Sequence, residues 1–245
     1  MPSYKTLGVV LKSQNYGEAG KILTVFTERF GKIKVMAKGI RKIKSHLAGT
    51  LEPFMLLNMQ LHEGKTFYII TSAQIEKDFP NVHTDIRKTA QAFFLGELID
   101  KFLQDEQKMS DVFMLFISSL ESLENSDRIL LIRAFELKLV EALGFKPELY
   151  NCIHCKEKIT PENNFWDAVE GGIICNNCQN SFHHGHKISD ETIKLLRFME
   201  QNDLARVNLL RSNQAILDET EELLGKYIKN ILERELKSER FLKML

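Results

Sequence analysis

The 245-residue sequence predicts an α+β multidomain protein: an N-terminal five-stranded OB-fold β-barrel followed by an α-helical domain that carries a four-cysteine zinc knuckle. Three observations predict this class. The first 80 residues are rich in β-branched and aromatic segments, which are typical of strands. Apolar residues recur at helical spacing after Pro80, and two C-x2-C pairs interrupt that helical region. We expect domains at 1–80 and 81–245, with the zinc-binding insertion at about 151–182.

The barrel prediction depends on five strand-like segments separated by glycine-containing turns. Glycine supplies the positive φ or the close backbone approach that such turns require. One connection, between the third and fourth segments, is longer than the others, which fits a five-stranded OB barrel. An SH3-like barrel is the nearest alternative on this pattern. The expected strands are Lys5–Ser13, Lys21–Thr27, Lys32–Ala37, Phe54–His62 and Thr66–Ile75.

The region after Pro80 is predicted to be helical. Ser189 is expected to begin one helix and Asp127 to cap another, because short polar side chains accept hydrogen bonds from the first turn. Gly144, followed closely by Pro147, predicts a helix end. Core-facing stripes are formed by Phe94, Leu98 and Phe102, by Ile132, Phe135, Leu139 and Ala142, and by Leu224, Ile228 and Ile231.

The composition excludes disordered and fibrous classes, since 44% of the residues are hydrophobic and 27% are charged. Residues 1–11 lack the pattern of a secretory signal, and no apolar run approaches the roughly 18 to 20 residues that span a bilayer. These features predict a cytoplasmic protein with no membrane partner. In that compartment thiols stay reduced, so the four cysteines indicate a metal site rather than disulfides.

The cysteines form two pairs, Cys152 with Cys155 and Cys175 with Cys178, separated by 19 residues. Each pair places two thiolates on one tight turn, and two facing turns provide the tetrahedral sulfur donors that Zn²⁺ prefers. Gly171-Gly172 supplies backbone freedom before the second pair. Four thiolates leave no open position for a water molecule, so the sequence predicts one structural Zn²⁺.

Other interpretations of this cluster stay open. Iron in the same four-thiolate cage, a redox dithiol and a catalytic metal are the alternatives. Neighbouring histidines are candidates for additional ligands, although solvated loop side chains are the simpler interpretation beside four thiolates. These histidines are His154, His183, His184 and His186.

The net charge is zero, but its distribution is asymmetric. Residues 1–50 contain ten lysines and arginines and two glutamates, a charge of +8, and the other 195 residues carry −8. A basic module on a neutral protein indicates a polyanion-binding domain joined to a second part of the chain that has a different role.

Alternation along 32–38 places Lys32, Lys34 and Lys38 on one face of a strand and apolar residues on the other. A basic loop follows this strand directly. As a charge run alone, the loop would be read as solvated, but the barrel context favours an OB-fold nucleic-acid-binding domain at 1–80. The predicted contacts are Lys32, Lys34, Lys38, Arg41, Lys42 and Lys44, followed by Arg29 and Lys21.

The sequence lacks a recognisable catalytic constellation. Gly64-Lys65-Thr66 resembles the end of a phosphate-binding loop, but Met59 stands where that loop requires glycine. The same Thr66 excludes a zinc-protease motif opened by His62-Glu63. Carboxylates near the helices are interpreted as solvated surface. They are Glu97, Asp100, Asp105 and Glu106. We therefore predict that the protein is not an enzyme.

The chain resembles the RecO family of recombination-mediator proteins in the order and spacing of several short motifs. The match extends from residue 4 to about residue 180. Its motifs are Tyr16-Gly17-Glu18, Leu23-Thr24-Val25-Phe26-Thr27, Gly31-Lys32, Ala37-Lys38-Gly39-Ile40-Arg41-Lys42, Lys44-Ser45, Leu51-Glu52-Pro53-Phe54, Gly144-Phe145-Lys146-Pro147-Glu148-Leu149 and Gly171-Gly172.

This resemblance implies a DNA-binding recombination mediator of bacterial DNA repair in the RecF pathway, cytoplasmic and nucleoid-associated. It implies binding of single- and double-stranded DNA, annealing of complementary strands, and action with RecR so that RecA loads onto DNA coated with single-strand-binding protein. Gly20 stands where many relatives have an acidic residue, so the first turn is expected to differ in shape. The main alternative is an RNA-binding or ribosome-associated OB-fold zinc protein, because the barrel and the cations do not distinguish the two polyanions. A nucleic-acid-modifying enzyme and a protein adaptor are further alternatives.

Overall fold

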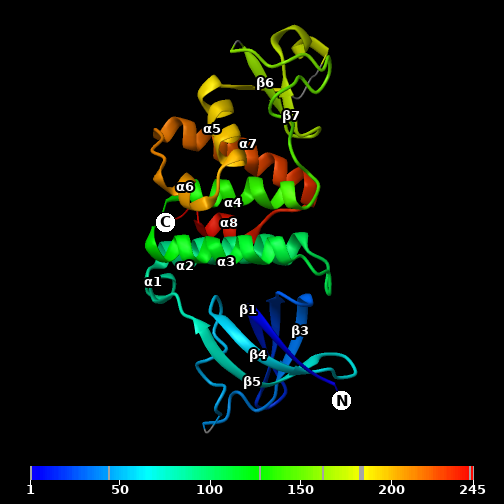
Figure 1. The fold of residues 1–245 in the computed structure, drawn as a ribbon, viewed down its shortest axis with the longest axis vertical. Coiled ribbons are helices and arrows are strands. Elements are labelled where there is room, and N and C mark those ends of the chain that lie inside the picture. Colours follow the sequence, from blue (N-terminus) through cyan, green and yellow to red (C-terminus); the bar gives the residue numbers. More distant parts are fainter. Residues whose placement is uncertain are drawn as a thin grey trace. The chain divides into compact units, whose positions relative to one another are not determined.

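A computed structural model describes residues 2–43, 45–126, 128–161, 163–181, 185–242 and 244. The chain forms two compact units (Figure 1). Unit 1 consists of Met1–Asn125 and Lys237–Leu245, and unit 2 consists of Ser126–Leu236. Along the part of the chain that the structure describes, no helix has the length and apolar character needed to cross a membrane.

Unit 1 begins with a closed five-stranded barrel in the order β1-β2-β3-β5-β4. Its antiparallel ladders include the pair Val9 and Phe26 between β1 and β2. Parallel pairing of Val35 with Tyr68 joins β3 to β5, and antiparallel pairing of β1 with β4 completes the closure. The predicted barrel and its five strands are confirmed. The strands are β1 Ser3–Tyr16, β2 Gly20–Thr27, β3 Gly31–Ala37, β4 Leu56–His62 and β5 Tyr68–Lys77.

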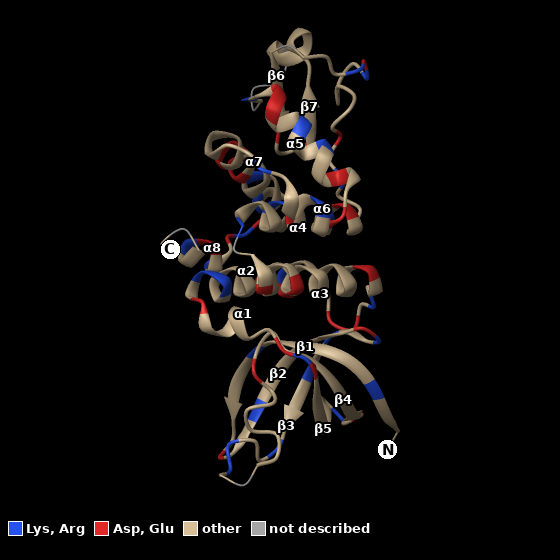
Figure 2. Ribbon diagram, turned by 60° about the vertical axis from the view of Figure 1, so that its left-hand side comes forward, with Lys and Arg blue, Asp and Glu red and all other residues tan. Residues whose placement is uncertain are grey.

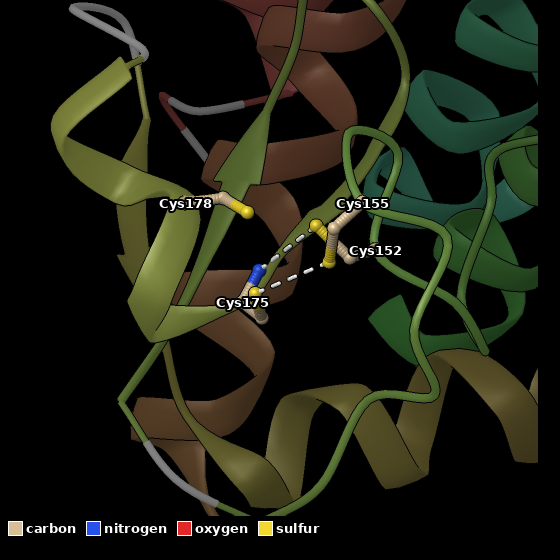
Figure 3. A group of neighbouring side chains, drawn as sticks. All are labelled: Cys152, Cys155, Cys175 and Cys178. Carbon is tan, nitrogen blue, oxygen red and sulfur yellow. Dashed lines mark hydrogen bonds between the residues drawn. The ribbon is translucent and has the colours of Figure 1, made fainter.

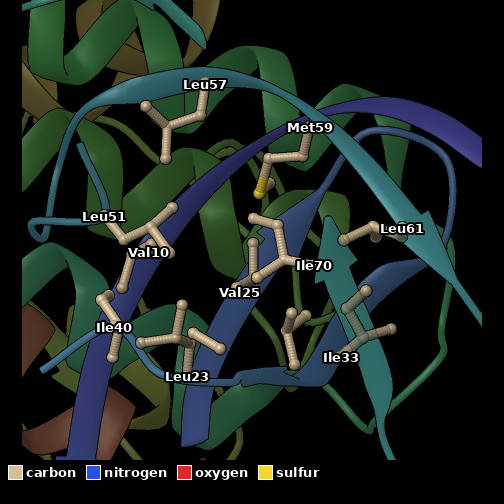
Figure 4. Close-up of a cluster of buried hydrophobic side chains, with 12 residues drawn as sticks. Val10, Leu23, Val25, Ile33, Ile40, Leu51, Leu57, Met59, Leu61 and Ile70 are labelled. Atoms are coloured by element: carbon tan, nitrogen blue, oxygen red, sulfur yellow. The ribbon is translucent and has the colours of Figure 1, made fainter. Parts of the chain in front are cut away.

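The barrel interior is filled by side chains that alternate along the strands (Figure 4). Ile33, Val35 and Ala37 of β3 all lie in this buried cluster, so the predicted apolar face of the strand is confirmed. The alternation thereby fixes the even-numbered residues of β3 on the outer face. The other members of the cluster are Val10, Leu23, Val25, Ile40, Leu51, Leu57, Met59, Leu61 and Ile70.

The connection between β3 and β4 is anchored at both ends. Ile40 and Leu51 are buried in the barrel core. The backbone N–H of Phe54 donates to the carbonyl oxygen of Val10 at 3.0 Å, where Phe54 has a φ of 65°. Burial of these anchors leaves residues 41–43 exposed at one end of the barrel.

Helices cover part of the outer barrel surface within unit 1. The Phe26 ring of β2 is buried, with its centroid 5.4 Å from that of Phe113 in α3 and 6.2 Å from that of Phe116. The carboxylate of Glu97 in α2 accepts hydrogen bonds from the backbone N–H groups of Lys237 and Ser238, so the chain end packs on α2. The helices are α1 Pro80–Thr84, α2 Ile86–Phe102, α3 Ser110–Asn125 and α8 Lys237–Leu242.

Among the described residues of unit 2, four α-helices and a 3-10 helix accompany a small three-stranded sheet of order β7-β6-β8. The predicted helix start at Ser189 is confirmed, because its side chain accepts a hydrogen bond from the Thr192 backbone N–H. The helix end predicted at Gly144 is confirmed, since the helix 129–142 stops two residues earlier and Gly144 has a φ of 87°. Arg128 is the N-cap of α4, while Asp127 lies outside the described residues. The elements are α4 Ile129–Ala142, β6 Asn164–Asp167, β7 Gly172–Ile174, the 3-10 helix η1 Asn176–Ser181, β8 His186–Ile188, α5 Asp190–Gln201, α6 Leu204–Leu209 and α7 Gln214–Leu232.

Candidate metal centre and nucleic-acid interface

The four cysteines come together in unit 2 (Figure 3). Cys152 and Cys155 lie on a turn closed by a hydrogen bond from the Lys156 backbone N–H to the Cys152 carbonyl oxygen. Cys175 follows β7 and Cys178 lies in η1, where the Cys178 N–H donates to the Cys175 carbonyl oxygen. Each pair thus occupies one tight turn, as the spacing predicts.

The sulfur positions fit a tetrahedral metal ion. All four Sγ atoms lie within 4.8 Å of one another, and those of Cys155 and Cys175 are 3.8 Å apart. A Zn–S bond of about 2.3 Å gives a tetrahedron with sulfur–sulfur edges of about 3.8 Å. The four thiols therefore lie close together in a geometry that accommodates a metal ion.

The thiols also affect one another's ionisation. Burial raises the pKa of Cys152, but hydrogen bonds from the backbone N–H groups of Cys175, Cys155 and His154 outweigh burial and lower this pKa to about 7. Burial and the neighbouring thiols raise the pKa of Cys178 to about 12. A thiolate at Cys152 opposes ionisation of its neighbours, and a bound cation would remove that penalty.

Two glycines let the knuckle backbone approach its surroundings closely. Gly171 has a φ of 70°, and a Cβ there would lie 2.5 Å from the hydroxyl oxygen of Tyr227. A Cβ at Gly172 would lie 2.3 Å from the Cγ2 atom of Ile153. The predicted backbone freedom of this pair therefore serves two purposes: Gly171 adopts a left-handed conformation, and Gly172 permits a close approach.

Histidines do not enter the described sulfur cluster. The Nε2 atom of His186 lies 3.3 Å from the Nζ atom of Lys226. His183 and His184 lie outside the described residues. Within the described part of the chain, the group of side chains arranged to hold a metal consists of the four cysteines.

Four of the predicted nucleic-acid contacts lie at one end of the barrel. Lys21, the second residue of β2, pairs with Ala37, the last residue of β3, so Lys38 follows directly after the partner of Lys21. The Arg41 backbone N–H donates to the carbonyl oxygen of Ala19 in the β1–β2 turn at 3.0 Å, which keeps the basic loop against that turn. We call this group the cationic end; it consists of Lys21, Lys38, Arg41 and Lys42. Figure 2 shows the lysine and arginine positions of the chain in blue.

Lys38, Arg41 and Lys42 are exposed, and Lys21 is partly exposed. Lys44 belongs to the same loop in sequence, but it lies outside the described residues. The cationic end therefore presents at least three exposed positive charges on neighbouring turns.

Arg29 lies at the opposite end of β2. The six residue-to-residue steps of strand from Lys21 to Thr27 span roughly 20 Å at the rise of a β-strand. The Arg29 guanidinium carbon is 5.2 Å from the ring centroids of both Tyr4 and Phe30. Arg29 and the cationic end therefore form two separate positive regions rather than one continuous face.

The prediction that Lys32 belongs to an open cationic face is wrong. Its side chain is only 9% exposed, and its Nζ donates to the carbonyl oxygen of Asp100 at 2.6 Å. The carboxylates of Asp100 and Asp105 lie 3.6 Å and 3.4 Å from the same nitrogen. Alternation placed Lys32 correctly on the outer face, but α2 and the residues after it cover that position.

Lys34 occupies an intermediate position. Its Nζ donates to the Thr24 hydroxyl oxygen at 2.8 Å, and the residue is half-buried. Burial, followed by the charge of Lys12, lowers the pKa of Lys34. Lys34 also lines a pocket of about 310 Å³ beside the β4–β5 loop, together with Lys65 and Tyr68. Glu63, Asp105 and Glu106 line the same pocket, so a phosphate contact by Lys34 would be made beside acidic side chains.

Sequence analysis missed two features of this surface. Tyr16 is 52% exposed, and its ring centroid lies 6.5 Å from that of Phe67, so an aromatic contact joins the end of β1 to the β4–β5 loop. Lys65, in the pocket described above, belongs to the segment Gly64-Lys65-Thr66, which only resembles a phosphate-binding loop. Tyr16 beside a glycine turn is the signal that indicates this surface, because exposed aromatic rings stack on bases.

The interpretation of Asp100 as a solvated carboxylate is also wrong. Its side chain is 13% exposed, and Lys12 Nζ donates to it at 2.6 Å. Burial raises the pKa of Asp100, but the hydrogen bond and charge of Lys12, with the charges of Lys32 and Lys34, outweigh it and hold this pKa below its ordinary value. Asp100 therefore stabilises unit 1 in its ionised form.

We predict that Asp100→Asn lowers the free energy of unfolding by about 2–3 kcal/mol at neutral pH, because it leaves Lys32 without a buried counter-charge. The native pKa of Asp100 is below the unfolded value of about 3.9, so this stabilisation is present above about pH 4 and is lost at lower pH. Urea unfolding at a series of pH values measures it. This role would be contradicted if the difference in free energy of unfolding between the wild type and the variant stayed constant from neutral pH to below the native pKa of Asp100.

A closed OB-type barrel with a cationic end, joined to a helical region with four clustered cysteines, defines the class of two-part OB-barrel proteins with a cysteine knuckle. Family models for recombination protein O match nearly the whole chain, the N-terminal model at residues 1–79 and the C-terminal model at residues 83–240. The chain belongs to the RecO family.

The relatives below match over most of their length. A "DNA repair protein RecO" of Dehalococcoides mccartyi is 35% identical over 236 residues, which cover 96% of this chain and 93% of that protein. Proteins with the same name from Roseiflexus sp. and Thermoanaerobacter sp. are 32% and 30% identical. These matches cover 98% of this chain in both cases, and 84% and 97% of the two relatives.

Proposed function

We propose that this chain is a bacterial DNA repair protein that binds single- and double-stranded DNA and acts without catalysis as a recombination mediator. In this proposal it anneals complementary strands and, with RecR, helps RecA load onto DNA coated with single-strand-binding protein, in the cytoplasm at the nucleoid. Membership of the RecO family supports the DNA repair role. The interactions with RecR, RecA and single-strand-binding protein are part of the proposal.

The observation that carries DNA binding is the grouping of Lys38, Arg41 and Lys42 on exposed neighbouring turns of an OB-type barrel. In this proposal the lysines and the arginine contact phosphates rather than base edges, so binding would be independent of sequence. Neutralisation lowers the repulsion between two strands held on one protein, which favours annealing. We propose residues 1–80 as the DNA-binding domain, with Lys21, Lys34 and Lys44 as further contacts and Arg29 as a separate one.

We also propose that Cys152, Cys155, Cys175 and Cys178 hold one structural Zn²⁺. Zinc would neutralise the thiolates and join the two knuckle turns. Four sulfur ligands leave no position for a reacting water, so the metal would stabilise unit 2 rather than act on DNA.

A salt titration tests the electrostatic mechanism. If about 5 phosphates are engaged, the logarithm of the association constant for a single strand should fall with the logarithm of salt concentration at a slope of roughly −3.5. Fluorescence anisotropy of labelled DNA measures this slope. Affinity that is independent of salt would refute the proposed mode of binding.

The RNA-binding alternative and the mediator role need separate measurements. Competition between DNA and RNA strands of equal length and sequence discriminates between the two polyanions, and preferential displacement by RNA would contradict the proposal. Annealing of complementary strands coated with single-strand-binding protein, measured with and without RecR, tests the mediator role. We expect annealing to require this chain and RecR to alter its rate.

A further inference from the structure

The tip of the basic loop carries a fully exposed apolar residue. Ile43 has a relative exposure of 104% and directly follows two exposed cations, Arg41 and Lys42. Single exposed apolar residues are common on protein surfaces, so exposure alone indicates nothing. The position of Ile43 directly after Arg41 and Lys42 of the cationic end is what gives it a specific chemical context.

The loop holds Ile43 outward through its backbone. Ile40, three residues earlier, is buried in the barrel core. The Lys42 N–H donates to the Gly39 carbonyl oxygen at 3.0 Å, and the Ser45 N–H donates to the Lys42 carbonyl oxygen at 2.9 Å. Two successive turns therefore place Ile43 at the tip rather than against the barrel.

We infer that Ile43 is a wedge that inserts between adjacent bases of single-stranded DNA held by Lys38, Arg41 and Lys42. This inference rests on the proposed DNA binding and adds a contact to the bases. Isoleucine is among the apolar residues that proteins insert between base steps. Adjacent cations would hold the phosphates on either side of the step, so the electrostatic attraction would offset the cost of unstacking.

Single strands are the favoured occupant for an energetic reason. Inserting a side chain into a duplex disrupts stacking within paired strands and costs a few kcal/mol per step, whereas a single strand has no pairing to distort. An apolar anchor for another protein would not require three cations around it, and a polyanion complements that charge. Unstacked bases would also be presented in a form that is open to pairing with a second strand.

The test uses the full chain and single-stranded DNA that contains aminopurine, an adenine analogue whose fluorescence is quenched by stacking. Anisotropy of an end label measures binding on the same DNA. We expect the wild-type chain to raise aminopurine fluorescence, and Ile43→Ser to remove most of that rise while weakening binding by only about threefold to tenfold. Ile43→Leu should retain the rise because it remains an apolar wedge.

Val169→Ser serves as the matched control, since Val169 is another exposed branched apolar residue but is followed by Glu170 rather than preceded by cations. It should behave as the wild type. An equal fluorescence rise in Ile43→Ser, or binding by the wild type with no rise, would overturn the wedge and leave DNA binding intact. Failure of the wild-type chain to bind in the anisotropy measurement would instead overturn the proposed function.

Discussion

Reversing three charges at the cationic end, with Lys38→Glu, Arg41→Glu and Lys42→Glu together, is expected to lower the affinity for single-stranded DNA on the order of 100-fold at low salt. The change replaces three phosphate contacts with three repulsive charges. It should also flatten the salt dependence, because fewer counterions are released on binding. Anisotropy titrations at several salt concentrations measure both quantities.

The fold should tolerate this change, since all three side chains are exposed and the loop anchors Ile40 and Leu51 remain in place. A matched control reverses three exposed cations of unit 2, which alters the net charge equally. These are Lys194, Arg211 and Arg234. We expect the control to retain DNA binding to within about threefold. Equal losses in both variants, or no loss in the first, would place the DNA site elsewhere.

Loss of the metal site is the second change with a large expected effect. Cys175→Ser should abolish the binding of one equivalent of zinc and lower the free energy of unfolding by at least about 3 kcal/mol. A structural metal stabilises the folded state by the whole of its binding free energy, and three remaining thiolates no longer complete the tetrahedron. Elemental analysis and thermal unfolding measure these effects.

His154→Ser is the control for this experiment, because His154 lies between the first two cysteines without belonging to the sulfur cluster. It should retain one equivalent of metal. DNA affinity of folded Cys175→Ser at low temperature should stay close to that of the wild type, since the cationic end belongs to unit 1. Iron in place of zinc, or a metal content that is unchanged by Cys175→Ser, would contradict the proposed site.

The barrel was predictable because its signals are local. Alternation within 32–38 was sufficient to assign Ile33 and Val35 to the core and Lys32 to the outer face. The same alternation carries no information about what covers an outer face. Lys32 is buried because Asp100, almost 70 residues away in sequence, reaches the same surface. Long-range contacts of this kind cannot be read from a strand pattern.

The cysteine cluster was predictable for a similar reason. Two C-x2-C turns and one spacer specify which side chains converge, whatever the surrounding structure. The three-stranded sheet beside them was missed, because β7 and β8 contain three residues each and give no period-two pattern. Arg29 shows the limit of counting charge along a sequence, since a single β-strand carries it to the far end of the barrel.

The return of the chain end to unit 1 has a consequence for synthesis on the ribosome. The barrel strands emerge first, yet Glu97 receives its hydrogen bonds from Lys237 and Ser238 only after 140 further residues have been translated. All of unit 2 is made in that interval. Unit 2 is thus an insertion within unit 1, and the hydrogen bonds that Lys237 and Ser238 contribute to unit 1 can form only after unit 2 has been translated.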